Sequence, residues 1–383
     1  MLFPVKHPAV NWVDGMKISR RQFIDTDNHF TDSLRDTASL FLRNYDFGLL
    51  PPFRGQRLSC DFEISERIGQ VEVRLRQCSA ITAGGVRIHF VPDGYDDQLV
   101  KQFAFTGEEE KDNQAQHYSI VLGANPYERV PAGTPDAGET PPRHPYAGVQ
   151  YDLSILPASQ VEAGEMGLNH LVIGQITREN GRVSVNGQYI PPSAAIVSHP
   201  GLIRYYERFS ALLNEIQISS LRIIEKVAAR DNKLTLALNI KMLCERLLDY
   251  IAQIFFSYRN MMHQQPPVML VSCFSNMAHL FYSTLHYSGA KEKEEMLKYF
   301  YEWKDVTPGN FEDLLLRTID VVYDHYNIHR SMEQVSECMQ VLAALLNKLS
   351  SLEFIGQPKG NIVVAEEKMV EQIKVRNSWS ILD

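Results

Sequence analysis

The 383-residue chain lacks an excess of basic residues, a long apolar run and any Cys-x-x-Cys pair. Its 38 Lys and Arg are outnumbered by 46 Asp and Glu, so they form no basic stripe of the kind that neutralises phosphates, and we expect no nucleic-acid partner. No stretch approaches eighteen consecutive apolar residues, and the first residues do not read as a signal peptide, which predicts a cytoplasmic protein. The five widely spaced cysteines fit reduced thiols better than a disulfide or zinc framework.

Catalytic motifs are also missing. The sequence has no phosphate-binding loop, no dinucleotide fingerprint, no nucleophile elbow and no His-Glu-x-x-His. We therefore predict a protein that is not an enzyme and that has no cofactor and no metal. One alternative stays open: His325 and His329 stand four apart on a predicted helix, a spacing at which two imidazoles can share a metal, although a surface or capping role explains them more simply.

Between residues 56 and 190 the apolar residues alternate with polar ones in short runs, as in half-buried strands. Gly84-Gly85 separates two of these runs, and Asn180-Gly181 separates two others as a two-residue hairpin turn would. With no helical pattern between the strands, this region predicts an antiparallel β-sandwich or barrel. Residues 123–148, with six prolines and four glycines, are predicted to be a long loop of the kind that often binds a partner.

Ahead of the strands, the sequence predicts a helix over residues 19–42. Ser19 and Gln22 have the spacing of a capping box. The side chains of Phe23, Phe30, Leu34 and Phe41 fall on one stripe of this helix, and we expect that stripe to pack on the sheets.

Past Pro192 the apolar period changes from two to about 3.6. Two helices of about 27 to 30 residues follow, and further helices are predicted over 267–287, 291–303, 310–327 and 331–353. A lone hairpin of that length leaves the flanks of its apolar seam in water, so we expect other helices of the chain and symmetric copies to cover it. The candidate residues for this bundle and oligomer interface are Leu202, Tyr206, Phe209, Leu213, Ile216, Ile240, Leu243, Leu247 and Ile254.

The predicted fold class is therefore α+β and multidomain. The predicted parts are a β-sandwich over residues 1–192, a helical bundle stalk over 193–305, and a small, mainly helical C-terminal head and tail over 306–383.

The N-terminal sequence resembles that of a known family. The string Val10-Asn-Trp12-Val-Asp14-Gly15-Met16-Lys-Ile18, followed by Phe23, is similar to the opening of the TssK family, baseplate subunits of bacterial type VI secretion systems, which have Trp-x-Glu-Gly-Met-x-Leu and then Gln-His-Phe. Asp14 replaces the usual Glu. Further on, Phe47-Gly48-Leu49-Leu50, His144-Pro145-Tyr146 and Pro200-Gly201-Leu202 look like family segments in the same order. The resemblance covers roughly residues 5 to 260, and the predicted head departs from the family because it has few strand patterns.

The resemblance implies a non-enzymatic, homotrimeric structural adaptor in the bacterial cytoplasm, peripheral to the inner membrane through the secretion apparatus. It implies that the sandwich end attaches to TssF- and TssG-like baseplate proteins, and that the head reaches a membrane-complex component that is TssL- or TssM-like or a divergent replacement. The candidate baseplate-binding residues are Trp12, Gly15, Met16 and Phe23. For Trp12 and Phe23 a local core that fastens the N-terminal segment to the sheets is the alternative. For the whole chain, the alternative is a phage-derived receptor-binding trimer that binds glycans.

Overall fold

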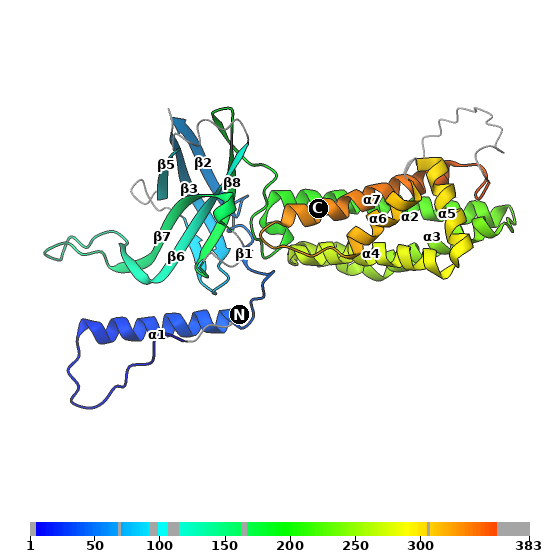
Figure 1. The fold of residues 1–383 in the computed structure, drawn as a ribbon. Helices are drawn as coiled ribbons and strands as arrows, with labels where there is room; N and C mark the ends of the chain where they lie inside the picture. The colour runs from blue at the N-terminus through cyan, green and yellow to red at the C-terminus, as the bar shows by residue number, and fades with distance from the viewer. Residues whose placement is uncertain are drawn as a thin grey trace. The chain divides into compact units, whose positions relative to one another are not determined.

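The computed structural model describes residues 5–67, 70–91, 99–105, 115–161, 167–304 and 307–357 (Figure 1). The chain divides into two compact units. The first contains Met1–Gly201 and the short segment Asp324–Ile328, and the second contains Leu202–Tyr323 and His329–Asp383. The predicted separation of the helical part into a stalk and a head stays a prediction, and residues 358–383 of that head lie outside the described residues.

The first unit contains two antiparallel sheets. In one sheet β3 (Gln70–Ile81) is central and pairs with all the others, which are β1 (Gly48–Leu49), β2 (Cys60–Arg67), β4 (Arg87–Phe90) and β5 (Leu99–Ala104). The other has the order β7-β6-β8-β9, with strands β6 (Gln116–Ala132), β7 (Tyr146–Pro157), β8 (His170–Glu179) and β9 (Arg182–Val185). Buried residues of both sheets, such as Leu75, Ile120 and Leu171, form one hydrophobic core. The predicted α+β fold with an N-terminal antiparallel β region is confirmed.

Local signals in the sequence explain where the strands turn. Asn180 and Gly181 have φ angles of 51° and 76° and join β8 to β9, with Glu179 opposite Arg182, as the two-residue hairpin prediction requires. Along β3 every second side chain from Val71 to Leu75 is buried, which is the expected alternation of a strand with one face on a core.

The proline-rich segment is mainly a hairpin, so the prediction of a 26-residue loop was wrong. Strands β6 and β7 continue into it and remain paired as far as Ala132 opposite Tyr146. Pro126 is tolerated because the register of β6 shifts between Asn125 and Arg129, and a bulge is where a residue without an N–H group costs no ladder hydrogen bond. The connection itself is limited to residues 133–145.

The second unit is a helical bundle. Its helices are α2 (Pro200–Ala229), α3 (Thr235–Asn260), α4 (Pro267–Tyr287), α5 (Ala290–Lys304), α6 (Pro308–Ile319) and α7 (Ile328–Ser351). Within the described residues, α4 is the one helix whose length and composition would suit a membrane span, with a mean hydropathy of 1.2 and half of its apolar window buried. Its Leu270, Phe274 and Phe281 have no exposed surface, as in the central helix of a bundle.

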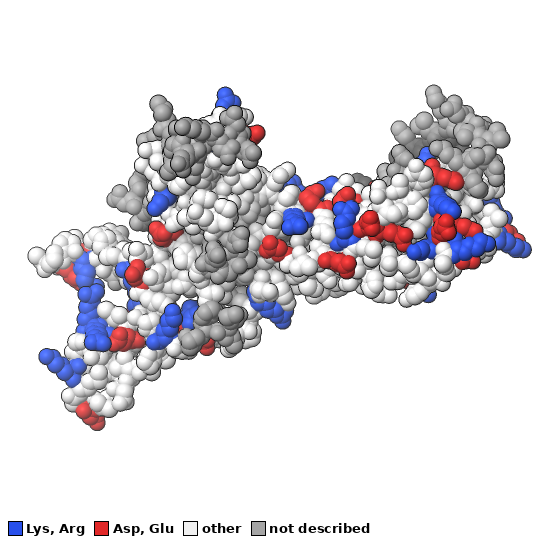
Figure 2. Space-filling model, viewed as in Figure 1, with Lys and Arg blue, Asp and Glu red and all other residues white. Residues whose placement is uncertain are grey.

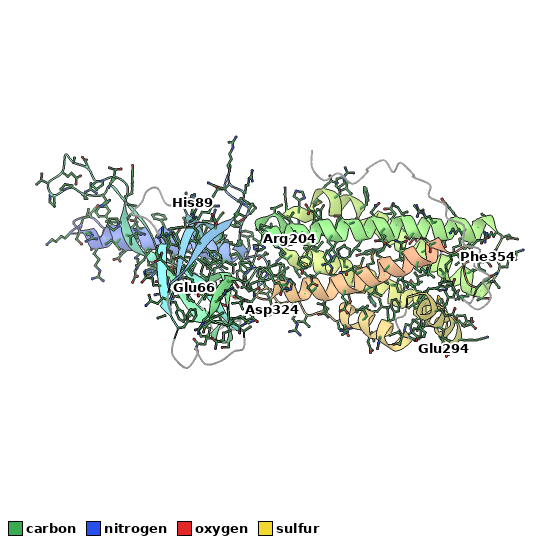
Figure 3. All side chains as sticks on the ribbon, turned by 90° about the horizontal axis from the view of Figure 1, so that it is seen from above. Glu66, His89, Arg204, Glu294, Asp324 and Phe354 are labelled. Atoms are coloured by element: carbon green, nitrogen blue, oxygen red, sulfur yellow. The ribbon has the colours of Figure 1, made fainter. Side chains whose placement is uncertain are left out.

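Polar contacts join α2 to α3 and to the end of α7. Tyr206 of α2 and Tyr258 of α3 stack with ring centroids 5.0 Å apart, and the hydroxyl of each donates a hydrogen bond to the backbone carbonyl of the other, at 3.1 and 3.0 Å. Arg204 and Phe354 lie at opposite ends of this unit (Figure 3). Near the second end, the ammonium of Lys226 donates to the carbonyls of Ser350 and Leu352, at 2.7 and 2.8 Å, where α7 ends.

The helix predicted over residues 310–327 is too long. Helix α6 ends at Ile319, and residues Asp324–Ile328 belong to the first unit. There His325 is buried, its Nε2 donates to the carbonyl of Phe47 at 2.9 Å, and the two rings meet edge to face at 4.7 Å. This long-range burial ends the helical segment early, and local periodicity does not encode it.

Candidate partner-docking site

The N-terminal helix α1 (Arg20–Ser39) begins at a capping box. The amide of Ser19 donates to Oε1 of Gln22 at 2.9 Å, and Oγ of Ser19 accepts from the amide of Arg21 at 3.3 Å. These bonds satisfy amides that have no partner within the helix. The predicted helix start is therefore confirmed.

The orientation of α1 is the reverse of the predicted one. Its one buried residue is the charged Asp32, and the helix contacts the sandwich through its polar side. At about 100° per residue, Phe23 and Asp32, nine residues apart, point to opposite sides. The predicted apolar stripe therefore lies in solvent: Phe23 is 60%, Phe30 61%, Leu34 72% and Phe41 78% exposed. Phe23, Phe30 and Leu34 lie on α1, whereas Phe41 lies two residues past its end at Ser39, so the helix predicted over residues 19–42 was too long. We call these four residues the apolar face of α1.

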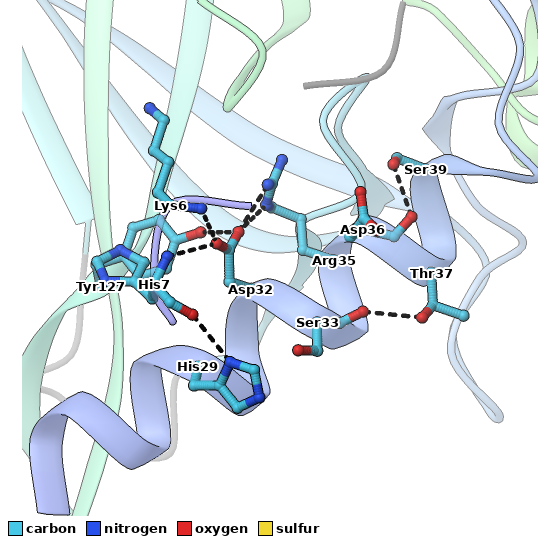
Figure 4. Close-up of polar contacts among 10 residues, drawn as sticks. All are labelled: Lys6, His7, His29, Asp32, Ser33, Arg35, Asp36, Thr37, Ser39 and Tyr127. Atoms are coloured by element: carbon cyan, nitrogen blue, oxygen red, sulfur yellow. Dashed lines mark hydrogen bonds and ion pairs between the residues drawn. The ribbon is translucent and has the colours of Figure 1, made fainter. Parts of the chain in front are cut away.

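Asp32 fixes the helix to the rest of the first unit (Figure 4). One carboxylate oxygen, Oδ1, accepts from Nη2 of Arg35 at 2.6 Å and from the hydroxyl of Tyr127, on β6, at 2.8 Å. The other, Oδ2, accepts from the backbone amides of Lys6 and His7, the latter at 3.0 Å. We call this set of five residues the Asp32 clamp.

The clamp keeps Asp32 ionised. Burial alone would raise the pKa of this carboxyl, but the hydrogen bonds from Arg35, Tyr127 and the two backbone amides outweigh burial and hold the pKa well below its usual range. Aromatic packing and a further hydrogen bond support the same arrangement. The His7 and Tyr127 rings are 4.4 Å apart, and Nδ1 of His29 donates to the His7 carbonyl at 2.9 Å.

Two further contacts hold α1 against the sheets. Arg129 of β6 forms an ion pair with Asp27 at 2.9 Å. At the other end, the turn between β3 and β4 passes so close to the helix that a Cβ on Gly85 would lie 2.6 Å from the Arg35 carbonyl oxygen. The polar side of α1 is therefore attached along most of its length, and its apolar face cannot turn inward without breaking these contacts.

The structure brings together some of the predicted baseplate-binding residues. The Trp12 and Phe23 rings are 6.4 Å apart and tilted, at the start of the apolar face, and Trp12 is 48% exposed. Met16 is half-buried and lines a hollow of about 450 Å³ with Arg21 and Gln22. Gly15 occupies an exposed turn with φ 79°, where nothing lies within 4 Å of the position of a Cβ. The local-core alternative does not describe Trp12 and Phe23, because both rings keep much of their surface in solvent.

The predicted seam residues lie inside the second unit. Ile254 is half-buried, and the other eight are at most 4% exposed in the single chain: Leu202, Tyr206, Phe209, Leu213, Ile216, Ile240, Leu243 and Leu247. Helices of the same chain already cover these side chains. A contact with a second copy would therefore have to use other residues.

The two histidines do not converge on a metal. His325 bonds to the Phe47 carbonyl, and Nδ1 of His329 lies 3.0 Å from the Tyr205 hydroxyl. The buried His325 does not have the predicted surface role. In the part of the chain that the structure describes, no group of three His, Cys, Asp or Glu side chains could hold a metal ion.

Sequence reasoning missed the Asp32 clamp and the outward direction of the apolar face. One signal was available: an Asp and an Arg at i and i+3 lie on the side of α1 opposite its apolar stripe, a spacing at which an ion pair forms. The partners from residues 6–7 and from Tyr127 are distant in sequence and gave no pattern.

No family model matches the chain, and no curated protein matches it. Solved structures do match. The chain in a crystal structure of TssK is 15% identical, and the match covers 88% of this chain and 70% of the TssK chain, with a TM-score of 0.54. A chain in the baseplate complex of the type VI secretion system is 15% identical, and the match covers 90% of this chain and 100% of that one, with a TM-score of 0.50. A chain in a TssK-TssF-TssG baseplate subcomplex is 13% identical, and the match covers 88% of this chain and 99% of that one, with a TM-score of 0.48. Over most of its length the chain is thus structurally similar to TssK of the type VI secretion baseplate.

Proposed function

We propose that this chain is a non-enzymatic structural adaptor of a type VI secretion baseplate, and that a TssF- or TssG-like protein docks on the apolar face of α1. The single observation that carries the proposal is the orientation of this helix. Three large apolar side chains of α1 stand in water on one face and Phe41 is exposed just past the helix end, while the opposite face is fixed to the sandwich by a buried carboxylate. A contiguous exposed apolar surface of this kind marks an interaction site.

The surface around the apolar face extends it toward the N-terminus. Val13 and Ile18 are each 58% exposed and lie in the same segment as Trp12. Aromatic side chains are the commonest anchors of protein interfaces because they bury a large area with few rotatable bonds. The predicted site residues Trp12, Met16 and Phe23 belong to this surface, and Gly15 shapes the turn between them.

The similarity to TssK supports the choice of partner and of assembly. The matched structures include a baseplate complex, and the match to one chain of that complex covers 90% of this chain. We infer a homotrimer that carries three copies of the apolar face. Linking three weak contacts in one particle raises the overall affinity by a factor of about 10²–10⁴, which suits an adaptor between parts of different symmetry.

The helical unit would supply the other end of the adaptor. We propose that it meets a membrane-complex component, TssL- or TssM-like or a divergent replacement, which would keep the protein in the bacterial cytoplasm and peripheral to the inner membrane. Neither a cofactor nor a metal is needed for this role.

Co-purification from the native cell tests the proposal. The tagged chain is expected to carry TssF- and TssG-like proteins, and Phe23→Asp and Phe30→Asp to reduce their yield at least tenfold, because an aspartate cannot enter a desolvated apolar contact. Val322→Asp is the matched control, since Val322 is 88% exposed in the other unit. Equal recovery of these partners by all four proteins would refute docking on the apolar face.

A further inference from the structure

A large cleft lies between α1 and the β6–β7 hairpin. It has a volume of about 920 Å³, and its walls come from the first unit alone. On one side α1 contributes Arg20, Ile24 and Asn28, which are four residues apart and lie on one stripe of the helix. On the other side the hairpin contributes two tyrosines, Tyr127 and Tyr146, and residues 139–144 from the second half of its proline-rich connection.

The walls of this cleft suit an extended peptide. Pro131, Pro141 and Pro142 and the two tyrosines present flat, rigid, apolar surfaces, and Tyr146 is 73% exposed. Grooves with such walls bind extended segments because a side chain can enter between rings while the backbone stays in water. Arg129 also lines the cleft, but its ion pair with Asp27 and its contacts with Asn28 and Thr31 engage it with α1.

The charge of the cleft is opposite to that of the chain. The chain has a formal charge of −8, whereas the lining contains three arginines, one histidine and a single carboxylate, Glu139. Arg20 is exposed and has no ion pair within the described residues. Arg143 binds Glu139 through Nε and Nη2 at 2.7 and 2.8 Å, which leaves Nη1 for another acceptor. Figure 2 shows Lys and Arg side chains on both sides of the gap between α1 and the hairpin.

We propose that this cleft binds an extended, acidic segment of a partner protein. Its carboxylates would meet Arg20 and Arg143, and an apolar side chain between them would lie against the tyrosine and proline surfaces. A polyphosphate matches less well, since Glu139 stands beside Arg143 and the walls between the arginines are apolar. The inference rests on the proposed function only in assigning this segment to the protein that docks on the apolar face of α1.

Fluorescence anisotropy with the full chain tests the proposal. The probe is a labelled twelve-residue peptide in which Glu, Pro and Leu repeat, and the comparison peptide has Lys in place of each Glu. We expect binding of the Glu peptide that weakens as salt is raised. Arg20→Glu and Arg143→Glu should each weaken it at least fivefold, whereas Arg57→Glu, an exposed arginine of the same unit that is not part of the cleft, should change it less than twofold.

Several results would overturn the proposal: no binding of the Glu peptide, equal binding of the Lys peptide, or equal affinity in the arginine variants. Tripolyphosphate that displaces the peptide at lower concentration than unlabelled peptide does would point to a phosphate ligand and would also overturn it. Phe30→Asp should keep the peptide affinity. If the peptide fails to bind while co-purification still depends on Phe30, only this inference falls and the proposed function stands.

Discussion

At the scale of single residues, Asp32 decides how α1 is attached. A buried carboxylate is tolerated only when charge and hydrogen bonds compensate for lost hydration, and here an arginine, a tyrosine and two amides do so. Because the pKa of Asp32 is lowered in the folded state, the ionised carboxylate stabilises the fold. This stabilisation is present above the ordinary carboxyl pKa of 3.8 and is lost only as the pH falls below that value.

Replacing the charge should release the helix. Asp32→Asn leaves Arg35 without its buried partner, and we expect the attachment of α1 to weaken by roughly 3 kcal/mol. Hydrogen exchange of the α1 amides at pH 7 is the measurement, with faster exchange expected along the helix. Asp36→Asn, one turn further on and outside the clamp, is the control. Unchanged exchange in Asp32→Asn would mean that the clamp does not hold the helix.

His325 predicts a pH dependence of the same sign at higher pH, because the pKa of this group too is lowered in the folded state. Burial lowers its pKa to about 4, although its bond to the Phe47 carbonyl acts in the opposite direction. The folded state therefore favours the neutral ring. Stability from this residue is complete above the unfolded pKa of about 6.5, falls as the pH drops from there to about 4, and then levels off, with a total change of roughly 3 kcal/mol.

Urea unfolding of the full chain at pH 7 and pH 5 measures this effect. The unfolding free energy of the wild type should fall between the two pH values, and His325→Gln should show a smaller fall because its side chain does not titrate. Equal pH dependence in both proteins would assign the effect to other groups.

At the scale of elements, the fit of α1 on the sandwich depends on the turn between β3 and β4. Gly85 has φ 80°, which side chains with a Cβ rarely adopt, and the helix backbone leaves no room for one. Gly85→Ala should destabilise the first unit by about 2 kcal/mol and lower its melting temperature by several degrees. Gly187→Ala, where nothing lies within 4 Å of the added carbon, should melt as the wild type does. Equal melting of both variants would contradict the close approach.

The elements that could be predicted from the sequence are those with local signals. The Ser19 capping box and the Asn180-Gly181 turn each depend on residues within a few positions, and the structure has both. The extent of the β6–β7 hairpin was missed because a bulge accommodates Pro126, and the end of α6 was missed because His325 is buried against a residue far away in sequence.

The docking site could be predicted only in part. The apolar stripe of α1 is visible in the sequence, but periodicity states that a face is apolar and not what covers it. The direction was set by Asp32 and its partners from residues 6–7 and β6, which no local pattern connects. For the same reason the seam residues of α2 and α3 could be recognised as apolar, while their enclosure by the same chain could not.

At the scale of the whole molecule, the adaptor hypothesis predicts a homotrimer. Since the seam residues are already buried in one chain, the contacts between the chains of the trimer must use exposed side chains of either unit. Native mass spectrometry of the purified chain should give three times the mass of one chain. A folded monomer at micromolar concentration would remove the multivalent mechanism and leave a single docking surface.

The central claim is that the apolar face of α1 is where the baseplate partner docks, and site-specific photo-crosslinking in the native cell tests it most directly. A benzophenone amino acid is placed at Phe30, and in a control at Val322, and the products are identified by mass spectrometry. The account predicts a crosslink from position 30 to a TssF- or TssG-like protein and none from position 322. A position-30 product that contains only further copies of this chain, or no product in cells that assemble the baseplate, would contradict it.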